Sequence, residues 1–313
     1  MKVIINYQEY SDVEIEKKII RDAFNGVEII ESRTRNPDEF IQQAQGVQAA
    51  LVQYVPVNKN VIDALSECRG YVRFGIAYDN IDAAYAAQKG KVVANVPQYC
   101  IDEVSNHALS MLLALNRKLV LANRLLLEGN RELAAIRPIR RLKECTVGIV
   151  GMGNIGKSLA DKLRPLVNKI LFYDPFVKSC RGCEKAGLER IFSDSDYISL
   201  NLPLTDETKG LIDRRFLSSM KPNACIINTS RGATVDEQAL IELLQQGRLG
   251  GAGLDVFAVE PLPPDSPLRK LSNVILTNHI GWYSEDAIVE LKETAAKQAV
   301  QILKGQRPTF AVV

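Results

Sequence analysis

Residues 146–156 of the chain read TVGIVGMGNIG, and residues 157–163 continue as KSLADKL. The apolar run predicts a strand, the three glycines have the spacing G-x-G-x-x-G, and the following residues favour a helix. Gly151 permits a tight turn, Gly153 lets the backbone approach a pyrophosphate, and Gly156 allows the helix to pack closely on the strand. We therefore expect the free N–H groups of a helix N-terminus to bind a dinucleotide phosphate here.

An acidic residue follows the next strand of the same unit. The apolar stretch Ile170–Tyr173 predicts that strand, and Asp174 comes directly after it, 18 residues beyond Gly156. A carboxylate at this spacing accepts hydrogen bonds from a ribose 2′-hydroxyl and repels a 2′-phosphate. The pattern predicts NAD rather than NADP as the cofactor. The alternative is an ordinary strand-to-helix turn, with Asp174 as a solvated loop carboxylate.

The first hundred residues alternate between strand and helix patterns. Ser11 and Glu14 predict a capping box, and Asn36 followed by Pro37 predicts a second helix start, with Gly46 ending that helix. Alternation of this kind favours a parallel sheet. The predicted strands are Val3–Asn6, Val27–Ile30, Ala49–Val52, Val72–Phe74 and Val92–Ala94, and further helices are predicted near 60–67 and 81–88.

A second alternating set begins at Thr146. One long helix, from Ile101 to about Glu128, is predicted to join the two halves, and a last helix over 284–303 is free to pack back on the first half. Six strands suit a doubly wound domain, so the chain is predicted to be α/β with two parallel sheets. These strands are Thr146–Val150, Ile170–Tyr173, Tyr197–Leu200, Ala224–Asn228, Gly253–Val256 and Val274–Thr277.

Composition excludes several classes of protein. The 313 residues hold 39 Lys and Arg against 37 Asp and Glu with no basic block, so a nucleic acid is not an expected partner. No segment reaches the roughly 18 uninterrupted apolar residues that a membrane helix needs. The six cysteines are scattered, which favours reduced thiols and a cytoplasmic location. The pair Cys180 and Cys183 is interpreted as part of a surface connection.

Only two histidines are present, which narrows the search for a proton-exchanging group. His107 lies within the predicted long helix and is interpreted as structural. His279 follows the strand Val274–Thr277, at the carboxyl end where open α/β sheets place their ligands. Arg231 and Glu260 also follow predicted strands, although either one alone is more typical of a surface ion pair.

Taken in order, these motifs resemble the D-isomer-specific 2-hydroxyacid dehydrogenase family. The resemblance spans nearly the whole chain and includes substrate-domain and crossover segments at 73–82 and 95–97. The motifs that carry it are the glycine loop with Asp174, Asn201-Leu202-Pro203-Leu204-Thr205, Ser230-Arg231-Gly232, Asp255 through Glu260-Pro261, and His279.

The resemblance implies a domain arrangement and a cofactor. It implies a Rossmann NAD domain, residues 100–280, inserted into a flavodoxin-like substrate domain, residues 1–99, to which a C-terminal helix, residues 281–313, returns. It also implies a cleft between the domains and a homodimer. The implied NAD-binding residues are Gly151, Gly153, Asn154, Ile155, Gly156, Asp174, Pro203, Thr205, Thr229, Ser230, Arg231, Asp255 and His279.

The family's catalytic roles fit the residue types. The resemblance implies that Arg231 binds the substrate carboxylate, His279 acts as acid and base, Glu260 orients that histidine, and Asp255 holds the nicotinamide end of the cofactor. Reduction of a 2-oxo acid to its D-2-hydroxy acid needs a hydride, a proton and a cation for the carboxylate; NADH, His279 and Arg231 supply them.

The implied substrate contacts, besides Arg231, are Tyr54, Gly75, Ile76 and Trp282. In the loop, Ala77 stands where a second glycine is usual, but the N–H groups of Gly75 and Ile76 can still donate. Before His279, Asn278 stands where proline is common.

The substrate is expected to be a small or medium 2-oxo acid. A phosphorylated acid is disfavoured, because residues 53–58, QYVPVN, contain no Arg or Lys. Residues 281–285, GWYSE, resemble the C-terminal-binding-protein-like branch, whose members include NAD-sensing corepressors. An NAD(H)-sensing regulatory protein is therefore the alternative function.

Overall fold

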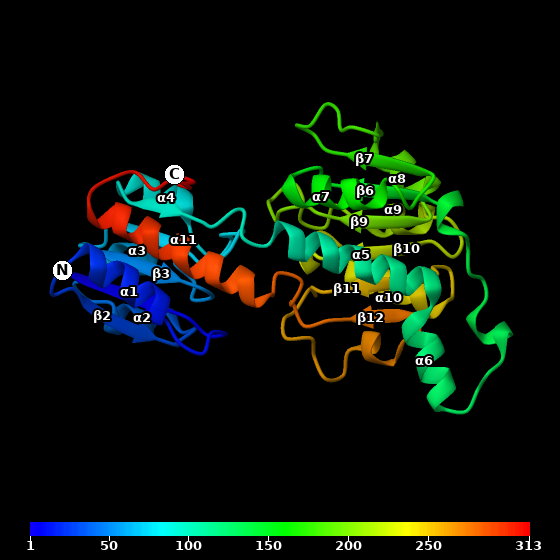
Figure 1. Cartoon of the computed structure of the whole chain (residues 1–313), viewed down its shortest axis with the longest axis horizontal. Helices are drawn as coiled ribbons and strands as arrows, with labels where there is room; N and C mark the ends of the chain where they lie inside the picture. The colour runs from blue at the N-terminus through cyan, green and yellow to red at the C-terminus, as the bar shows by residue number, and fades with distance from the viewer. The chain divides into compact units, whose positions relative to one another are not determined.

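A computed structural model describes residues 1–313, and they divide into two compact units. Unit 1 comprises Met1–Tyr99 and Ser284–Val313, and unit 2 comprises Cys100–Tyr283. In Figure 1 the C-terminal helix α11, drawn in red and orange, lies among the blue and cyan elements of unit 1. None of the helices is long and apolar enough to cross a membrane.

Unit 1 is built on a five-stranded parallel sheet with the order β2-β1-β3-β4-β5. This is the flavodoxin-like order. The strands confirm the predicted ones to within two residues at each end. They are β1 Lys2–Asn6, β2 Glu28–Ser32, β3 Ala49–Val52, β4 Gly70–Arg73 and β5 Val92–Ala94.

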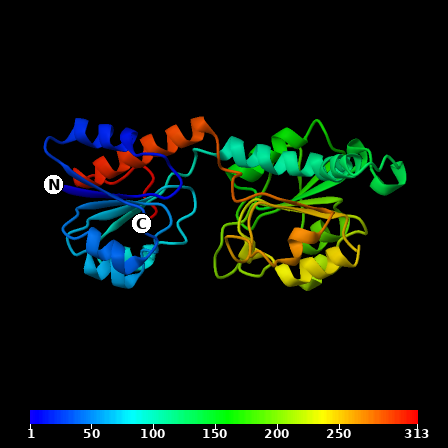
Figure 2. The same cartoon turned by 90° about the horizontal axis from the view of Figure 1, so that it is seen from below.

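Helices cover both faces of this sheet. Helices α1 and α11 pack together on one face, and α2, α3 and α4 lie on the other (Figure 2). Side-chain oxygens of Asn36 and Ser284 cap α2 and α11. The helices are α1 Glu14–Ala23, α2 Pro37–Gln43, α3 Lys59–Ala64, α4 Ala83–Gln88 and α11 Glu285–Leu303.

The capping box predicted for α1 is wrong. The helix begins at Glu14, so this residue occupies the first helical position rather than the third. The Ser11 hydroxyl donates to the Asp12 carboxylate (2.9 Å), and Asp12 Oδ1 accepts the Glu14 N–H at 3.1 Å. The first turn is therefore satisfied by the carboxylate next to the predicted cap.

Unit 2 is built on a seven-stranded parallel sheet with the order β12-β11-β10-β9-β6-β7-β8. The order reverses at β6, which makes this a Rossmann sheet with its switch point beside the glycine loop. All six predicted strands are present. The seventh strand, β8, is not predicted from the sequence, because its two residues are too few to show a periodic pattern. The strands are β6 Thr146–Val150, β7 Lys169–Tyr173, β8 Glu184–Lys185, β9 Tyr197–Leu200, β10 Cys225–Asn228, β11 Gly251–Leu254 and β12 Val274–Leu276.

The predicted long helix is broken into two. Helix α5 ends at Arg117, Lys118 adopts a left-handed conformation (φ 53°), and α6 continues in a new direction (Figure 1). The Lys118 ammonium donates to the Gly250 carbonyl at 3.2 Å, which ties the break to the sheet. Apolar periodicity persists through such a break, so it cannot reveal it.

The remaining helices of unit 2 complete two layers. Helices α5 and α7 cover one face, and α8, α9 and α10 cover the other (Figure 2). The helices are α5 Ile101–Arg117, α6 Leu119–Leu127, α7 Asn154–Leu163, α8 Leu188–Asp194, α9 Arg214–Ser219 and α10 Glu237–Gln245. Four short 3₁₀ turns lie at Leu133–Ile136, Leu142–Glu144, Gly232–Thr234 and Pro267–Lys270.

No disulfide links any of the six cysteines, and four of them are buried. Cys180 and Cys183 lie in the connection between β7 and β8, where the Cys183 N–H donates to the Cys180 carbonyl at 3.1 Å. Gly182 supplies the positive φ that this turn requires. No group of three or more His, Cys, Asp or Glu residues is arranged to hold a metal ion.

Candidate active site

The glycine loop after β6 leaves backbone donors free for an anion. A Cβ at Gly151 would overlap the Asn201 carbonyl, and one at Gly156 would overlap the Gly151 carbonyl. At Gly153, by contrast, nothing lies within 4 Å of the Cβ position, so the loop is open there. Helix α7 begins at Asn154 and has no side-chain cap. Its first N–H groups and its dipole therefore fit a pyrophosphate.

Asp174 is buried rather than solvated, and it holds the glycine loop. Its Oδ2 accepts the Met152 N–H at 2.8 Å, and its Oδ1 accepts the N–H groups of Phe176 and Val177 at 2.9 Å each. Burial by itself raises the pKa of Asp174, but these backbone hydrogen bonds bring that pKa below its ordinary value. A carboxylate offers about four acceptor sites. One remains for a ribose hydroxyl.

The other predicted cofactor residues lie after neighbouring strands of unit 2. Pro203 and Thr205 follow β9, and their loop is closed by the Thr208 hydroxyl, which donates to the Pro203 carbonyl at 2.6 Å. Thr229 and Ser230 follow β10. The Thr229 hydroxyl is buried and has no hydrogen-bond partner, which is what a ligand-facing hydroxyl looks like before the ligand binds.

His279 and Glu260 form the contact that the motif predicts. His279 Nδ1 lies 2.7 Å from Glu260 Oε2, and Glu260 Oε1 accepts the Phe257 N–H at 3.1 Å. Burial raises the pKa of Glu260, but the His279 hydrogen bond and the nearby Arg231 charge more than offset this, and the pKa falls below its ordinary value. An ionised carboxylate on Nδ1 fixes the ring and leaves Nε2 for proton exchange.

Arg231 follows β10 at the same edge of the sheet. Its Nη1 donates to the Ser230 carbonyl at 2.8 Å, and its own carbonyl accepts from the Asn228 side chain at 3.0 Å. The next residue, Gly232, packs against the main chain of Phe257 so closely that a Cβ would overlap it. The loop that carries Arg231 and the loop that leads to Glu260 are therefore in direct contact.

Asp255 holds the His279 loop, a role that sequence reasoning missed. Its Oδ1 accepts the Thr277 hydroxyl at 2.5 Å and the Ile280 N–H at 2.9 Å, and its Oδ2 accepts the Gly281 N–H at 2.8 Å. Burial raises the pKa of Asp255, but its hydrogen bonds lower it below the ordinary value. As at Asp174, about one acceptor site remains for a ligand.

His107 and Thr277 are further residues that the sequence did not reveal. His107 Nε2 lies 2.9 Å from Thr277 Oγ1, across 170 residues of sequence. The sequence feature that could have identified Thr277 is its position just before Asn278 and His279, at the end of the predicted strand that leads to the site.

Three predicted substrate residues lie in unit 1, and the fourth, Trp282, lies in unit 2 with its ring edge-on to Tyr283 (centroids 5.8 Å apart). Gly75 has φ 143°, and a Cβ there would overlap the Arg73 guanidinium. The Gly75 N–H donates to the Arg73 carbonyl at 3.0 Å. The Ile76 N–H is the remaining predicted donor of that loop.

Two arginines lie near Tyr54 in unit 1, although residues 53–58 contain no Arg or Lys. The Tyr54 hydroxyl donates to Glu9 at 2.7 Å. The Arg35 and Arg73 guanidinium carbons lie 4.8 and 5.9 Å from the centre of the Tyr54 ring. The loop of residues 53–58 contains no cation of its own. Arg35, three residues beyond β2, and Arg73, the last residue of β4, lie beside it.

The chain matches one family model and is similar in sequence to several known proteins. Residues 109–281 match the model described as D-isomer specific 2-hydroxyacid dehydrogenase, NAD binding domain. A D-3-phosphoglycerate dehydrogenase of Synechocystis sp. is 40% identical over 260 residues, which cover 82% of this chain and 47% of that protein. A glyoxylate reductase of Korarchaeum cryptofilum is 37% identical over 262 residues, covering 81% of this chain and 78% of that protein. The chain thus spans about half the length of the first relative.

A solved structure supports the fold over the whole length. D-lactate dehydrogenase from Aquifex aeolicus, solved with NAD and lactic acid, superposes with a TM-score of 0.89 at 26% identity, covering 99% of each chain.

Proposed function

Because the chain belongs to the D-isomer-specific 2-hydroxyacid dehydrogenase family, we propose that it is an NAD-dependent oxidoreductase that interconverts a small or medium 2-oxo acid and its D-2-hydroxy acid. The observation that carries the proposal is the 2.7 Å contact between His279 Nδ1 and Glu260 Oε2. It lies in unit 2 together with a glycine loop that fits a pyrophosphate. We further propose that unit 2 is the NAD domain and unit 1 the substrate domain.

The side chains divide the chemistry between them. The glycine loop and Asp174 would hold NADH, which when bound would supply the hydride for the C2 carbonyl. His279 donates a proton from Nε2 to the developing alkoxide, because Nδ1 is engaged by Glu260, and it accepts that proton in the reverse direction. The Arg231 fork binds the substrate carboxylate through two N–H groups. Glu260 holds the ring in one orientation and stabilises its positive charge.

A turnover assay with NADH and a panel of 2-oxo acids tests the proposal. We expect reduction of at least one acid, with kcat/KM lowered about 100-fold or more in Arg231→Lys, because lysine keeps the charge and loses the fork. Wild-type protein that binds NADH by calorimetry and reduces no acid in the panel would favour the NAD(H)-sensing alternative.

The panel also separates substrate classes. It pairs acids that carry a distal phosphate or carboxylate with apolar acids of the same length. Because Arg35 stacks 4.8 Å from the Tyr54 ring centre, Arg35→Ala should lower kcat/KM for distally charged acids about tenfold and leave the apolar acids unchanged. Arg33→Ala is the matched control, since Arg33 packs over Tyr7 instead. Equal losses for both substrate types would remove Arg35 from substrate recognition.

We also propose a cytoplasmic homodimer. The six cysteines form no disulfide, which supports a reducing compartment. Helix α6 and the segment after it expose Leu119, Val120, Leu126, Leu127 and Leu133 over more than half of each residue's surface, which is typical of an interface. Light scattering of the wild type should give twice the 34.7 kDa chain mass, and Leu127→Glu should shift the population toward monomer. A wild-type mass of one chain at micromolar concentration contradicts the dimer.

A further inference from the structure

We propose that His107 is a positioning residue for the acid–base histidine, acting through Thr277 and Asp255 to hold the loop that carries His279. The side chains of His107, Thr277 and Asp255 are together called the relay. The inference rests on the proposed function, because positioning matters only if His279 transfers protons. It assigns a chemical purpose to the histidine that the sequence favours as structural.

The direction of each hydrogen bond in the relay follows from proton counting. The Asp255 carboxylate only accepts, so the Thr277 hydroxyl, 2.5 Å from Oδ1, must donate its single proton to it. Thr277 Oγ1 can then only accept from His107 Nε2, 2.9 Å away, and the same Nε2 also lies 3.5 Å from Asp255 Oδ1. His107 must therefore carry a proton on Nε2.

The relay ends on the backbone N–H groups of residues 279–281, in the loop that carries the reacting imidazole. The Asp255 carboxylate accepts the N–H groups of Ile280 (2.9 Å) and Gly281 (2.8 Å), and the Asp255 carbonyl accepts the His279 N–H at 2.9 Å. Three consecutive N–H groups are thus held by one residue. A shift of Asp255 would move all three.

His279 needs this support because its backbone is strained. Its φ is 52°, in the left-handed region, which is unfavourable for a residue with a Cβ. Without the three N–H contacts, an extended conformation at 279 is favoured and would turn the ring away from Glu260. The relay therefore controls the same contact that carries the proposed function.

The relay is packed so that its members cannot adjust separately. A Cβ added at Gly281 would lie 2.9 Å from Asp255 Oδ2 and 3.3 Å from His107 Cδ2, so the carboxylate, the ring and this glycine touch one another. His107 projects from α5, which packs on β10 and β11. The helix thereby fixes the ring against β11, which ends at Leu254 just before Asp255.

Kinetics of single and double variants test the relay. We expect His107→Leu and Thr277→Val each to lower kcat about tenfold, with the KM for NADH within twofold of the wild type, because misplacing the acid slows the reaction without weakening cofactor binding. The double variant should be no slower than the worse single one, since both break one chain. His107→Gln, whose amide can donate to Thr277, should recover most of kcat.

A matched control and a second readout keep folding defects apart from positioning. Asn106→Leu alters the neighbouring, exposed residue of α5 and should leave kcat unchanged. The chain has only two histidines, so ¹⁵N spectra of the rings can be assigned directly. We expect the Nε2–H form of His107 in the wild type and shifted His279 resonances in His107→Leu.

Each outcome bears on one proposal or the other. An active wild type with full kcat in His107→Leu, or additive losses in the double variant, overturns the relay and leaves the proposed function intact. A wild type that reduces no 2-oxo acid overturns the proposed function. The relay's hold on His279 is still tested in that case, because unchanged His279 resonances in His107→Leu would refute it.

Discussion

Two buried carboxylates, Asp255 in unit 2 and Glu16 in unit 1, meet opposite surroundings. Their residues are 2% and 0% exposed. Asp255 accepts three hydrogen bonds, whereas neither Glu16 oxygen has a hydrogen-bond partner, and its one ionic neighbour, Lys292 Nζ, lies 3.7 Å away. The pKa of Asp255 is lowered, but burial raises that of Glu16 to about 7 despite the lysine. Donors, rather than burial, decide whether a carboxylate keeps its charge.

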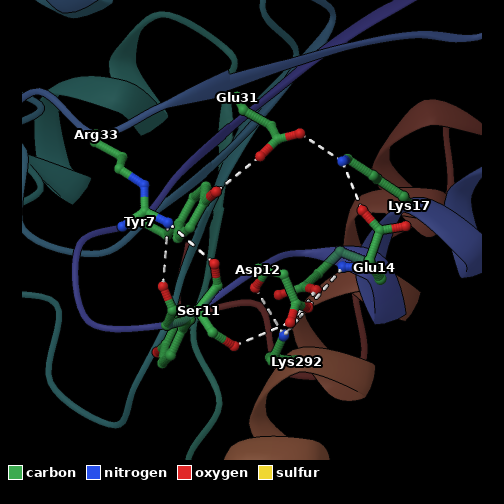
Figure 3. A network of polar contacts seen from close by, with 10 residues as sticks. Tyr7, Ser11, Asp12, Glu14, Lys17, Glu31, Arg33 and Lys292 are labelled. Atoms are coloured by element: carbon green, nitrogen blue, oxygen red, sulfur yellow. Dashed lines mark hydrogen bonds and ion pairs between the residues drawn. The ribbon is translucent and has the colours of Figure 1, made fainter.

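The polar network around α1 shows where the Lys292 donors go. Lys292, from α11, donates to the Asp12 carbonyl at 2.9 Å and approaches Asp12 Oδ1 at 3.3 Å (Figure 3). Lys17 pairs with Glu14 and Glu31 at the far side of the same network. The lysine's hydrogen bonds are thus made at the helix N-terminus, one turn away from Glu16.

The largest effect is expected from removing the Asp255 charge. Asp255→Asn keeps the shape but turns one acceptor into a donor that faces N–H groups, so the His279 loop should loosen and kcat should fall at least about 100-fold, with a clear loss in Tm. Steady-state kinetics and thermal unfolding measure both. Wild-type kcat in Asp255→Asn would show that the reaction needs the Asp255 charge no more than it needs the Glu16 carboxylate.

Glu260 should be the next most sensitive position. Glu260→Gln can still accept the Phe257 N–H but no longer places a charge on His279, so kcat should fall about 10- to 100-fold while Tm changes little. Glu237→Gln, at another carboxylate that accepts a backbone N–H of the same loop, is the control and should keep full kcat. Equal losses of kcat in both variants would mean that Glu260 acts only by holding the loop.

A smaller effect is expected at Asp174, the other buried carboxylate of unit 2 that accepts backbone N–H groups. Asp174→Ala removes the charge that repels a 2′-phosphate, so the preference for NADH over NADPH in kcat/KM should narrow about tenfold. Comparison of both cofactors with one 2-oxo acid measures it. Wild-type protein that uses NADPH as well as NADH would contradict this role.

The smallest effect, and one on stability alone, is expected at Glu16. Its pKa is about 7 when folded against an ordinary 4.5, so the wild type is most stable below pH 4.5 with respect to this group and loses that stability as the pH rises to about 7. Glu16→Gln cannot ionise and should be about 1–3 kcal/mol more stable than the wild type at pH 8, with no gain below pH 4.5. Denaturant unfolding at both pH values measures this. A variant less stable at pH 8 would mean that Lys292 needs the charge.

Local patterns predict most of the fold and part of the site. The glycine loop, the strand ends and His279 are each set by a few consecutive residues, so the sequence reveals them. The relay joins His107 and Thr277 across 170 residues, and the arginines near Tyr54 come from the loop after β2 and from the end of β4. Such contacts arise from tertiary packing, which periodicity does not encode. The Lys118 break is missed because a left-handed lysine interrupts no apolar pattern.

The position of Trp282 has a spectroscopic consequence. It is the only tryptophan in the chain, three residues beyond His279 and edge-on to Tyr283. All indole fluorescence of the protein therefore originates next to the loop that Asp255 holds. Indole emission overlaps the absorption of reduced nicotinamide, so energy transfer to bound NADH would quench it. Intrinsic fluorescence thus reports on the His279 loop and on cofactor occupancy from a single, naturally placed chromophore.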